Sequence, residues 1–189
     1  LFPDSEKDTT LEVNADGKLI LGNLNPGQTY YLVEAQAPDG YYLDRTPIEV
    51  TNDPNTVTYQ MLPNVSRAVR LEKIDSYSRK PLAGATFALY AADGTPVTGF
   101  VEKTVKDVSF YEKQDGGTAS LTTDENGMLK IHGLDAGDYY LQEITPAPGY
   151  HDDVNDTQYS FTLEENLPAT IQPDENGYTY VEGNGGQAV

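Results

Sequence analysis

The sequence contains an internal repeat, and no other feature limits the possible folds as strongly. Residues 14–27 (NADGKLILGNLNPG) align with residues 124–137 (DENGMLKIHGLDAG), and residues 30–34 (YYLVE) align with residues 139–143 (YYLQE). Self-similarity of this kind indicates two copies of one folding unit. The chain has 189 residues, which is enough for two small domains.

Both copies are predicted to be β structure. Asp16-Gly17 and Asn126-Gly127 are dipeptides typical of tight hairpin turns, and short strand-like runs flank them. No stretch shows a sustained helical period, so an antiparallel sandwich or barrel is favoured over alternating strands and helices. The predicted strands are 18–21, 29–33, 46–51, 56–61, 68–74, 85–90, 128–131, 138–142 and 158–163.

The boundary between the copies is expected near residues 63–66, where one strand-like run ends before the next begins at Ala68. We therefore predict one domain over residues 1–64 and a second over residues 65–189. The second copy is longer mainly at residues 95–118 and 168–177, which we interpret as loops or added hairpins. The first copy has no counterpart of residues 65–88, so we expect it to lack its first strand or strands.

The composition excludes several classes of protein. The formal charge is −18, because 30 Asp and Glu residues outnumber 12 Lys and Arg residues. General binding to nucleic acid or to anionic membranes needs a basic surface, so we expect neither partner. No apolar run approaches the roughly 20 residues of a membrane span. The absence of cysteine excludes disulfides, thiolate metal sites and cysteine nucleophiles. A secreted form would need another kind of cross-link.

Two ionisable side chains are predicted to face inward in the second copy. Side chains alternate between the two faces of a strand, so Lys73 shares a face with Val69 and Leu71. By the same alternation, Glu143 shares a face with Leu141. Burying either charge alone is costly, so the pair needs an explanation.

Two explanations fit the pair, and the residues alone leave both open. One is a buried ion pair, or a strand end where both side chains reach solvent. The other is covalent, because a desolvated lysine is a nucleophile and a carboxylic acid can polarise an asparagine amide and move protons. The product would be an intramolecular Lys-Asn isopeptide bond, formed with loss of ammonia. Such a bond would replace the missing disulfides.

Two motifs resemble those of a known family. Residues 34–41 (EAQAPDGY), which follow Tyr-Tyr-Leu-Val, resemble the E-box of Gram-positive pilins and surface adhesins, and residues 143–150 (EITPAPGY) are a looser match. Residues 71–75 (LEKID) and 81–90 (PLAGATFALY) resemble the opening of the Cna B-type domain in the same proteins. The resemblance covers nearly the whole chain.

The resemblance implies an all-β fold made of tandem Greek-key, prealbumin-like sandwiches. It also implies that Lys73 on the first strand is the nucleophile, that Glu143 of the E-box is the acid/base catalyst, and that an asparagine of the last strand is the acceptor. We choose Asn184 because alternation gives it the face of Tyr178 and Tyr180. The rival acceptors are Asn166 and Asn176.

The first copy matches the family only in part. Glu34 takes the position of the E-box glutamate and Asn64 that of the last-strand asparagine. No strand bearing the partner lysine is present, since Lys7 lies in a charged stretch and Lys18 follows the Asp-Gly turn. We therefore expect no isopeptide bond within the first copy.

By function, the resemblance implies a structural or adhesive module of a Gram-positive surface pilin or cell-wall adhesin, located outside the cell. Its partners would be neighbouring pilin or adhesin domains, and a host matrix protein or glycan if the module binds a ligand. The alternative is a ligand-binding or accessory β-sandwich module of a secreted glycan-degrading enzyme. We expect no cofactor, no metal and no turnover enzyme, because no nucleotide-binding, zinc or serine-hydrolase motif occurs.

Three weaker signals have ordinary interpretations. Asp124, Asn126 and Gly127 include part of a calcium-loop pattern but lack its spaced ligands, so a hairpin turn is expected. His132 is expected at the surface of its strand. Residues 167–170 (LPAT) lack the glycine and the hydrophobic tail of a sorting signal.

Overall fold

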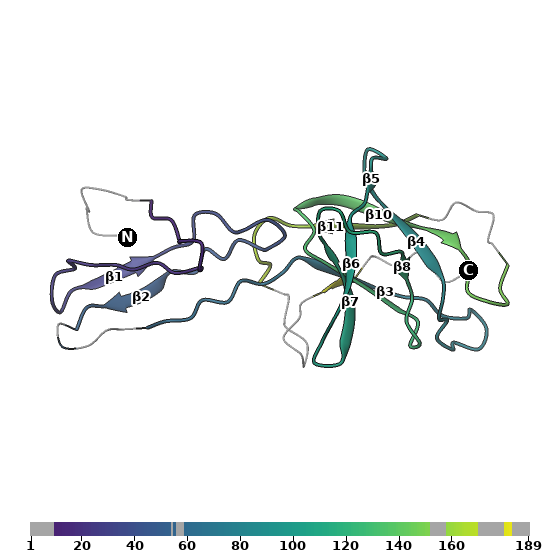
Figure 1. Cartoon of the computed structure of the whole chain (residues 1–189), viewed down its shortest axis with the longest axis horizontal. Helices are drawn as coiled ribbons and strands as arrows, with labels where there is room; N and C mark the ends of the chain where they lie inside the picture. The colour runs from purple at the N-terminus through teal and green to yellow at the C-terminus, as the bar shows by residue number, and fades with distance from the viewer. Residues whose placement is uncertain (1–9, 54, 56–58, 152–157, 170–179, 183–189) are drawn as a thin grey trace. The chain divides into compact units, whose positions relative to one another are not determined.

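The protein is an all-β chain, as the sequence predicts. The computed structural model describes residues 10–53, 55, 59–151, 158–169 and 180–182. These residues form strands and no helix, so none of them builds a helix that could span a membrane (Figure 1). The strands are β1 (Thr29–Leu32), β2 (Ile48–Thr51), β3 (Ala68–Glu72), β4 (Thr86–Ala91), β5 (Pro96–Val97), β6 (Phe100–Val105), β7 (Val108–Lys113), β8 (Leu121–Thr122), β9 (Met128–His132), β10 (Gly137–Thr145), β11 (Gln158–Leu163) and β12 (Val181–Glu182).

The chain divides into two compact units. The first unit spans residues 1–36 and 44–63, and the second unit spans residues 37–43 and 64–189. The sequence predicts domains over residues 1–64 and 65–189, whereas these units differ from that prediction in the placement of residues 37–43 and of Asn64. Residues 37–43, which the repeat places in the first copy, belong to the second unit.

The described part of the first unit contains one antiparallel pair of strands. Strands β1 and β2 pair from Thr29 with Thr51 to Leu32 with Ile48. The predicted turn at Asp16-Gly17 is present, since the Gly17 amide bonds to the Asn14 carbonyl, but residues 18–21 form no strand. Of the predicted strand 56–61, residues 59–61 form none and residues 56–58 lie outside the described residues.

The second unit contains two sheets. One has the strand order β11-β10-β4-β5, with β8 also pairing with β4, and the other has the order β12-β3-β9-β7-β6. Strand β12 runs parallel to β3, with Val181 opposite Val69. The last described strand of the chain therefore lies beside the first strand of this unit.

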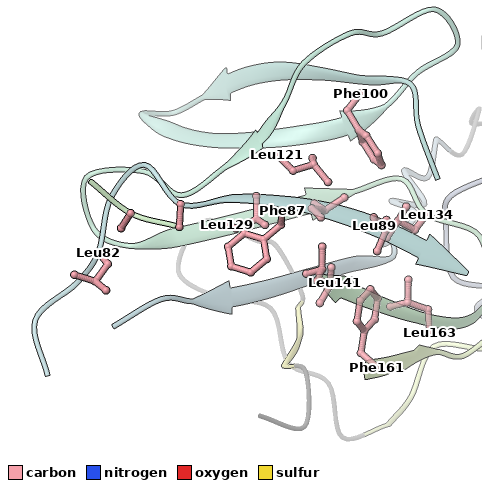
Figure 2. Packing of buried hydrophobic residues seen from close by; sticks show 14 residues of the cluster. Leu82, Phe87, Leu89, Phe100, Leu121, Leu129, Leu134, Leu141, Phe161 and Leu163 are labelled. Carbon is pink, nitrogen blue, oxygen red and sulfur yellow. The ribbon is translucent and has the colours of Figure 1, made fainter. Parts of the chain in front are cut away.

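A single hydrophobic core fills the second unit (Figure 2). Alternation places Phe87 and Leu89 of β4 and Leu129 of β9 inside, and all three are almost fully buried. Burying each such side chain contributes roughly 1.5–3 kcal/mol. The core also contains Phe100, Leu121, Leu134, Leu141, Phe161 and Leu163, which Figure 2 labels with these three.

The extra length at residues 95–118 contains an added hairpin, one of the two expected forms. Strands β6 and β7 pair antiparallel from Phe100 with Lys113 to Val105 with Val108. Lys106 and Asp107 make the turn with φ of 49° and 64°. Two consecutive left-handed residues are the conformation of the tight turn that matches strand twist. Residues 170–177 of the second insertion lie outside the described residues.

The expectation for His132 was wrong, because this side chain is buried. Its ring packs against Phe110, with ring centroids 4.3 Å apart, and its Nε2 lies 3.1 Å from the Tyr180 hydroxyl. His132 is on the outer face of its sheet, as alternation requires, but Tyr180 covers it there. A residue 48 positions further along the chain thus buries a side chain that local pattern places in solvent.

Candidate functional site

Lys73 and Glu143 meet inside the second unit. Lys73 follows directly after β3 in one sheet, and Glu143 lies on β10 in the other sheet. The Lys73 Nζ and the Glu143 Oε2 are 2.7 Å apart. The two side chains are only 24% and 14% exposed. The alternation read from the sequence thus places both residues on core-facing sides, and their ion pair connects the two sheets.

The second carboxyl oxygen of Glu143 has a different environment. Its Oε1 is buried and has no hydrogen-bond partner among the described residues. Buried carboxyl oxygens almost always have a partner, because leaving one without costs about 1–3 kcal/mol or more. Glu143 can therefore bond to Lys73 with one oxygen and offer the other to a further polar group.

A glycine turn positions the lysine. The Lys73 amide donates to the Gly127 carbonyl at 2.8 Å, and Gly127 has a φ of +70°. A Cβ at residue 127 would lie 2.4 Å from the Lys73 carbonyl oxygen. The Asn126-Gly127 turn therefore has to keep its glycine for two reasons, the left-handed backbone and the close approach of the Lys73 peptide. The sequence predicts this turn but not its contact with the lysine.

A β-bulge follows the glutamate. In the pairing of β10 with β4, Glu143 lies opposite Phe87 and Thr145 lies opposite Thr86, so Ile144 is the extra residue. Ile144 is exposed. Bulges change the direction of a strand and are common next to functional sites. Here the bulge shifts the pairing of β10 with β4 by one residue immediately after Glu143.

A second contact joins the same two motifs. The Tyr150 hydroxyl donates to the Asp75 Oδ2 at 2.9 Å, two residues beyond Lys73 and seven beyond Glu143. The backbone amide and the hydroxyl of Ser78, followed by the Tyr150 hydroxyl, lower the pKa of Asp75 from 3.8 to about 2. The hydrogen bond to Asp75 in turn raises the pKa of Tyr150.

These shifts predict a defined pH dependence. A carboxyl whose folded pKa lies below its ordinary value stabilises the fold above pH 4, and the stabilisation is lost as the pH falls through about 2. We expect Tyr150→Phe to move the pKa of Asp75 upward toward 3.8, since it removes one donor and leaves both Ser78 donors. An NMR titration of the Asp75 carboxyl measures this shift. An unchanged titration would show that Tyr150 does not bond to Asp75 in solution.

Of the three candidate acceptor asparagines, only Asn166 lies among the described residues. Asn184 and Asn176 lie outside the described residues. Asn166 is exposed and forms a bridge with Leu43. Tyr180, whose face the sequence uses to choose Asn184, lies under the Arg70 guanidinium at 5.6 Å. Arg70 and Lys73 lie on opposite faces of their strand. Sharing a face with Tyr180 is therefore not a reason to choose Asn184 as the acceptor for Lys73.

The first-copy candidates do not form a comparable site. The Glu34 Oε2 accepts a hydrogen bond from the Asp44 amide at 3.0 Å, which closes the loop between β1 and β2. Asn64 is exposed and is assigned to the second unit, whereas Glu34 is assigned to the first. Among the described residues, no three histidine, aspartate or glutamate side chains gather closely enough to hold a metal ion.

Comparison with known proteins identifies relatives of the chain. The family model "SpaA: Prealbumin-like fold domain" matches residues 3–64 and 67–176. No curated protein matches the chain significantly. Three similar solved structures are the major pilin subunit BcpA of Bacillus cereus, the 35 kDa C-terminal fragment of the major pilin GBS80 of Streptococcus agalactiae, and the Bacillus anthracis TIE protein.

The similarity to these structures is partial. BcpA is 30% identical with a TM-score of 0.41, over 62% of this chain and 27% of that one. GBS80 is 25% identical with a TM-score of 0.41, over 74% of this chain and 48% of the fragment. The TIE protein is 24% identical with a TM-score of 0.40, over 74% of this chain and 23% of that one. The chain thus spans less than half the length of each.

Proposed function

Because the chain belongs to the family of SpaA prealbumin-like fold domains, we propose that it is a structural and adhesive module of a Gram-positive surface pilin or cell-wall adhesin. In this proposal, an isopeptide bond from Lys73 to an asparagine of the last strand stabilises the second unit. The observation that carries the proposal is the Lys73–Glu143 pair, with its 2.7 Å contact and its unpartnered Glu143 oxygen.

The proposed reaction uses both oxygens of Glu143. Across the contact with Oε2, the carboxylate takes a proton from the Lys73 ammonium group and leaves a neutral amine. The amine nitrogen attacks the side-chain carbonyl carbon of the asparagine, while the protonated carboxyl polarises the amide oxygen. The carbon–nitrogen bond to the asparagine amide group then breaks, and Glu143 helps to move a proton to the departing nitrogen. One C–N bond forms, one breaks, and ammonia leaves.

Burial explains why this reaction would need no external catalyst. The fold holds the lysine and the carboxyl in contact, so the reaction avoids the entropy cost of bringing them together. The partly water-excluded site strengthens the hydrogen bond to the amide oxygen. Exposure disfavours Asn166 as the acceptor. Asn184 is our proposed acceptor, and Asn176 is its rival.

The bond would suit a module that carries load outside the cell without disulfides. The chain has no cysteine, and a covalent connection between the first and last strands would prevent this unit from being extended from its ends. Neighbouring pilin or adhesin domains would be its direct partners, with a host matrix protein or glycan as a further ligand. No observation favours the alternative of an accessory module in a glycan-degrading enzyme.

Peptide mapping tests the proposed bond and its acceptor. We expect a digest of the folded protein to yield a branched peptide in which Lys73 is joined to Asn184. The Lys73→Ala variant is the control and should lack this peptide. A branch to Asn176 or Asn166 would correct the acceptor only. Unmodified peptides for Lys73 and for all three asparagines would overturn the proposal.

A further inference from the structure

A short segment of the first copy is built into the second unit. Residues 37–43, which we call the 37–43 segment, follow the E-box glutamate and precede β2 in the sequence. The Tyr42 amide donates to the Val65 carbonyl at 2.9 Å, and the Arg67 amide donates to the Gly40 carbonyl at 2.8 Å. These bonds pair the segment with the chain that leads into β3.

The other side of the segment pairs with a different part of the second unit. The Leu43 amide donates to the Glu165 carbonyl at 2.9 Å, and the Leu167 amide donates to the Leu43 carbonyl at 3.0 Å. Residues 40–43 of the segment therefore form β-bridges with residues 65–67 on one side and with residues 165–167 on the other. Backbone bonds on both sides are the arrangement of an internal strand rather than of a surface loop.

The last two side chains of the segment are buried as in a core. Tyr42 and Leu43 are 1% and 3% exposed. The guanidinium of Arg67 lies 5.6 Å from the Tyr42 ring centroid, and Arg67 itself is buried and donates to the Glu164 and Glu165 carbonyls. A desolvated guanidinium over an aromatic ring is a favourable contact. The Tyr42 hydroxyl has no hydrogen-bond partner among the described residues, so the ring provides the packing.

A glycine contact fixes the position of the segment. Gly40 is buried with a φ of +78°, and a Cβ built on it would lie 2.8 Å from the Gly133 Cα. The glycine at residue 40 is therefore needed for the two backbones to approach so closely. The E-box alignment pairs Gly40 with Gly149, which has a φ of +88° but no atom within 4 Å of its Cβ position.

The second copy does not carry the same side chains. Where the first copy has Tyr42 and Leu43 after Gly40-Tyr41, the second copy has His151 and Asp152 after Gly149-Tyr150. His151 is exposed. A histidine and an aspartate could not fill an apolar site at comparable cost. The pair of side chains that can be buried here, Tyr42 and Leu43, therefore occurs in the first copy only.

We propose that the 37–43 segment is a structural strand of the second domain that the first copy supplies. The second domain is then not confined to residues 65–189 and reaches full stability only with this strand in place. Because the segment also connects β1 to β2, the folding of the second domain restrains both strands of the first copy. This inference depends on neither the isopeptide bond nor a role in a pilus.

A matched pair of glycine variants in the full chain tests the proposal. Gly40→Ala and Gly149→Ala both place an alanine at a positive φ, so they share the backbone strain. Only the first also forces a Cβ against Gly133. We expect Gly40→Ala to lower the melting temperature of the second unit by about 5 °C more than Gly149→Ala does. Equal shifts would overturn the proposal.

Hydrogen exchange of the unmodified chain gives a test that needs no variant. We expect the amides of Tyr42, Leu43 and Leu167 to exchange at least about a hundredfold more slowly than that of Arg45, and at a rate similar to that of β11. If Tyr42 and Leu43 exchange as fast as Arg45, the segment is not part of the second domain.

A tyrosine series separates ring packing from the hydroxyl group. Tyr42→Phe should leave the melting temperature within about 2 °C, since the hydroxyl makes no hydrogen bond among the described residues. Tyr42→Ala should lower it by roughly 10 °C. Tyr59→Ala, at an exposed position of the first unit, is the control and should not affect the second unit. A negligible effect of Tyr42→Ala would contradict the proposal.

Discussion

Replacing Glu143 by alanine is expected to abolish the isopeptide bond and to destabilise the second unit. The carboxyl group is the proposed proton carrier, and neither alanine nor the surrounding apolar core can replace it. By the chain-entropy argument developed for disulfides, a cross-link that closes a loop of this length contributes on the order of 4–5 kcal/mol. Mass spectrometry of the variant and denaturant unfolding monitored on the second unit measure the two effects.

Two further variants separate the covalent bond from the ion pair. Asn184→Ala keeps the Lys73–Glu143 contact and removes the proposed acceptor, so its loss of stability reports the cross-link alone. Glu72→Ala removes an exposed carboxylate next to Lys73 and should change stability by less than about 1 kcal/mol. Complete bond formation in Glu143→Ala would show that this carboxyl is not the catalyst.

The first unit should be digested by proteases well before the second. Its described residues contain one pair of strands and no fully buried side chain. A free strand edge and an uncovered apolar face leave the backbone open to proteolysis. The large apolar residues that are exposed in this unit are Leu11, Val13, Leu19, Ile20, Tyr31, Val33, Tyr59, Met61 and Leu62.

Limited proteolysis measures this difference directly. We expect cleavage within residues 10–36 and 44–63 to be at least about tenfold faster than cleavage within residues 64–151. We also expect no cross-link in the first copy, because neither of its described strands, β1 and β2, contains a lysine. Faster loss of the second unit, or a bond from Lys7 or Lys18 to Asn64, would show that our alignment of the first copy is wrong.

Sequence patterns were sufficient where structure depends on near neighbours. The repeat, the Asn126-Gly127 turn and strands β3, β4, β9, β10 and β11 follow from dipeptide chemistry and from the two-residue period. The same period gave the inward faces of Lys73 and Glu143, so the lysine and the glutamate of the candidate site could be placed without coordinates. Only the distance between them, which depends on how the two sheets pack, required the structure.

The features that were missed depend on contacts between distant residues. His132 is buried because Tyr180 covers it, and Tyr42 is buried because residues 65–67 and 165–167 enclose the 37–43 segment. No local pattern distinguishes such side chains from exposed ones. The strand expected at residues 18–21 failed for the opposite reason, since a strand-like sequence forms a strand only where another strand pairs with it.

The intact mass of the folded protein tests the central claim most directly. If Lys73 is joined to an asparagine, the purified chain should weigh one ammonia less than its sequence mass, and Lys73→Ala should have its full sequence mass. Both proteins should be measured after denaturation, so that only covalent bonds contribute. A folded, soluble protein that has its complete sequence mass would contradict the account.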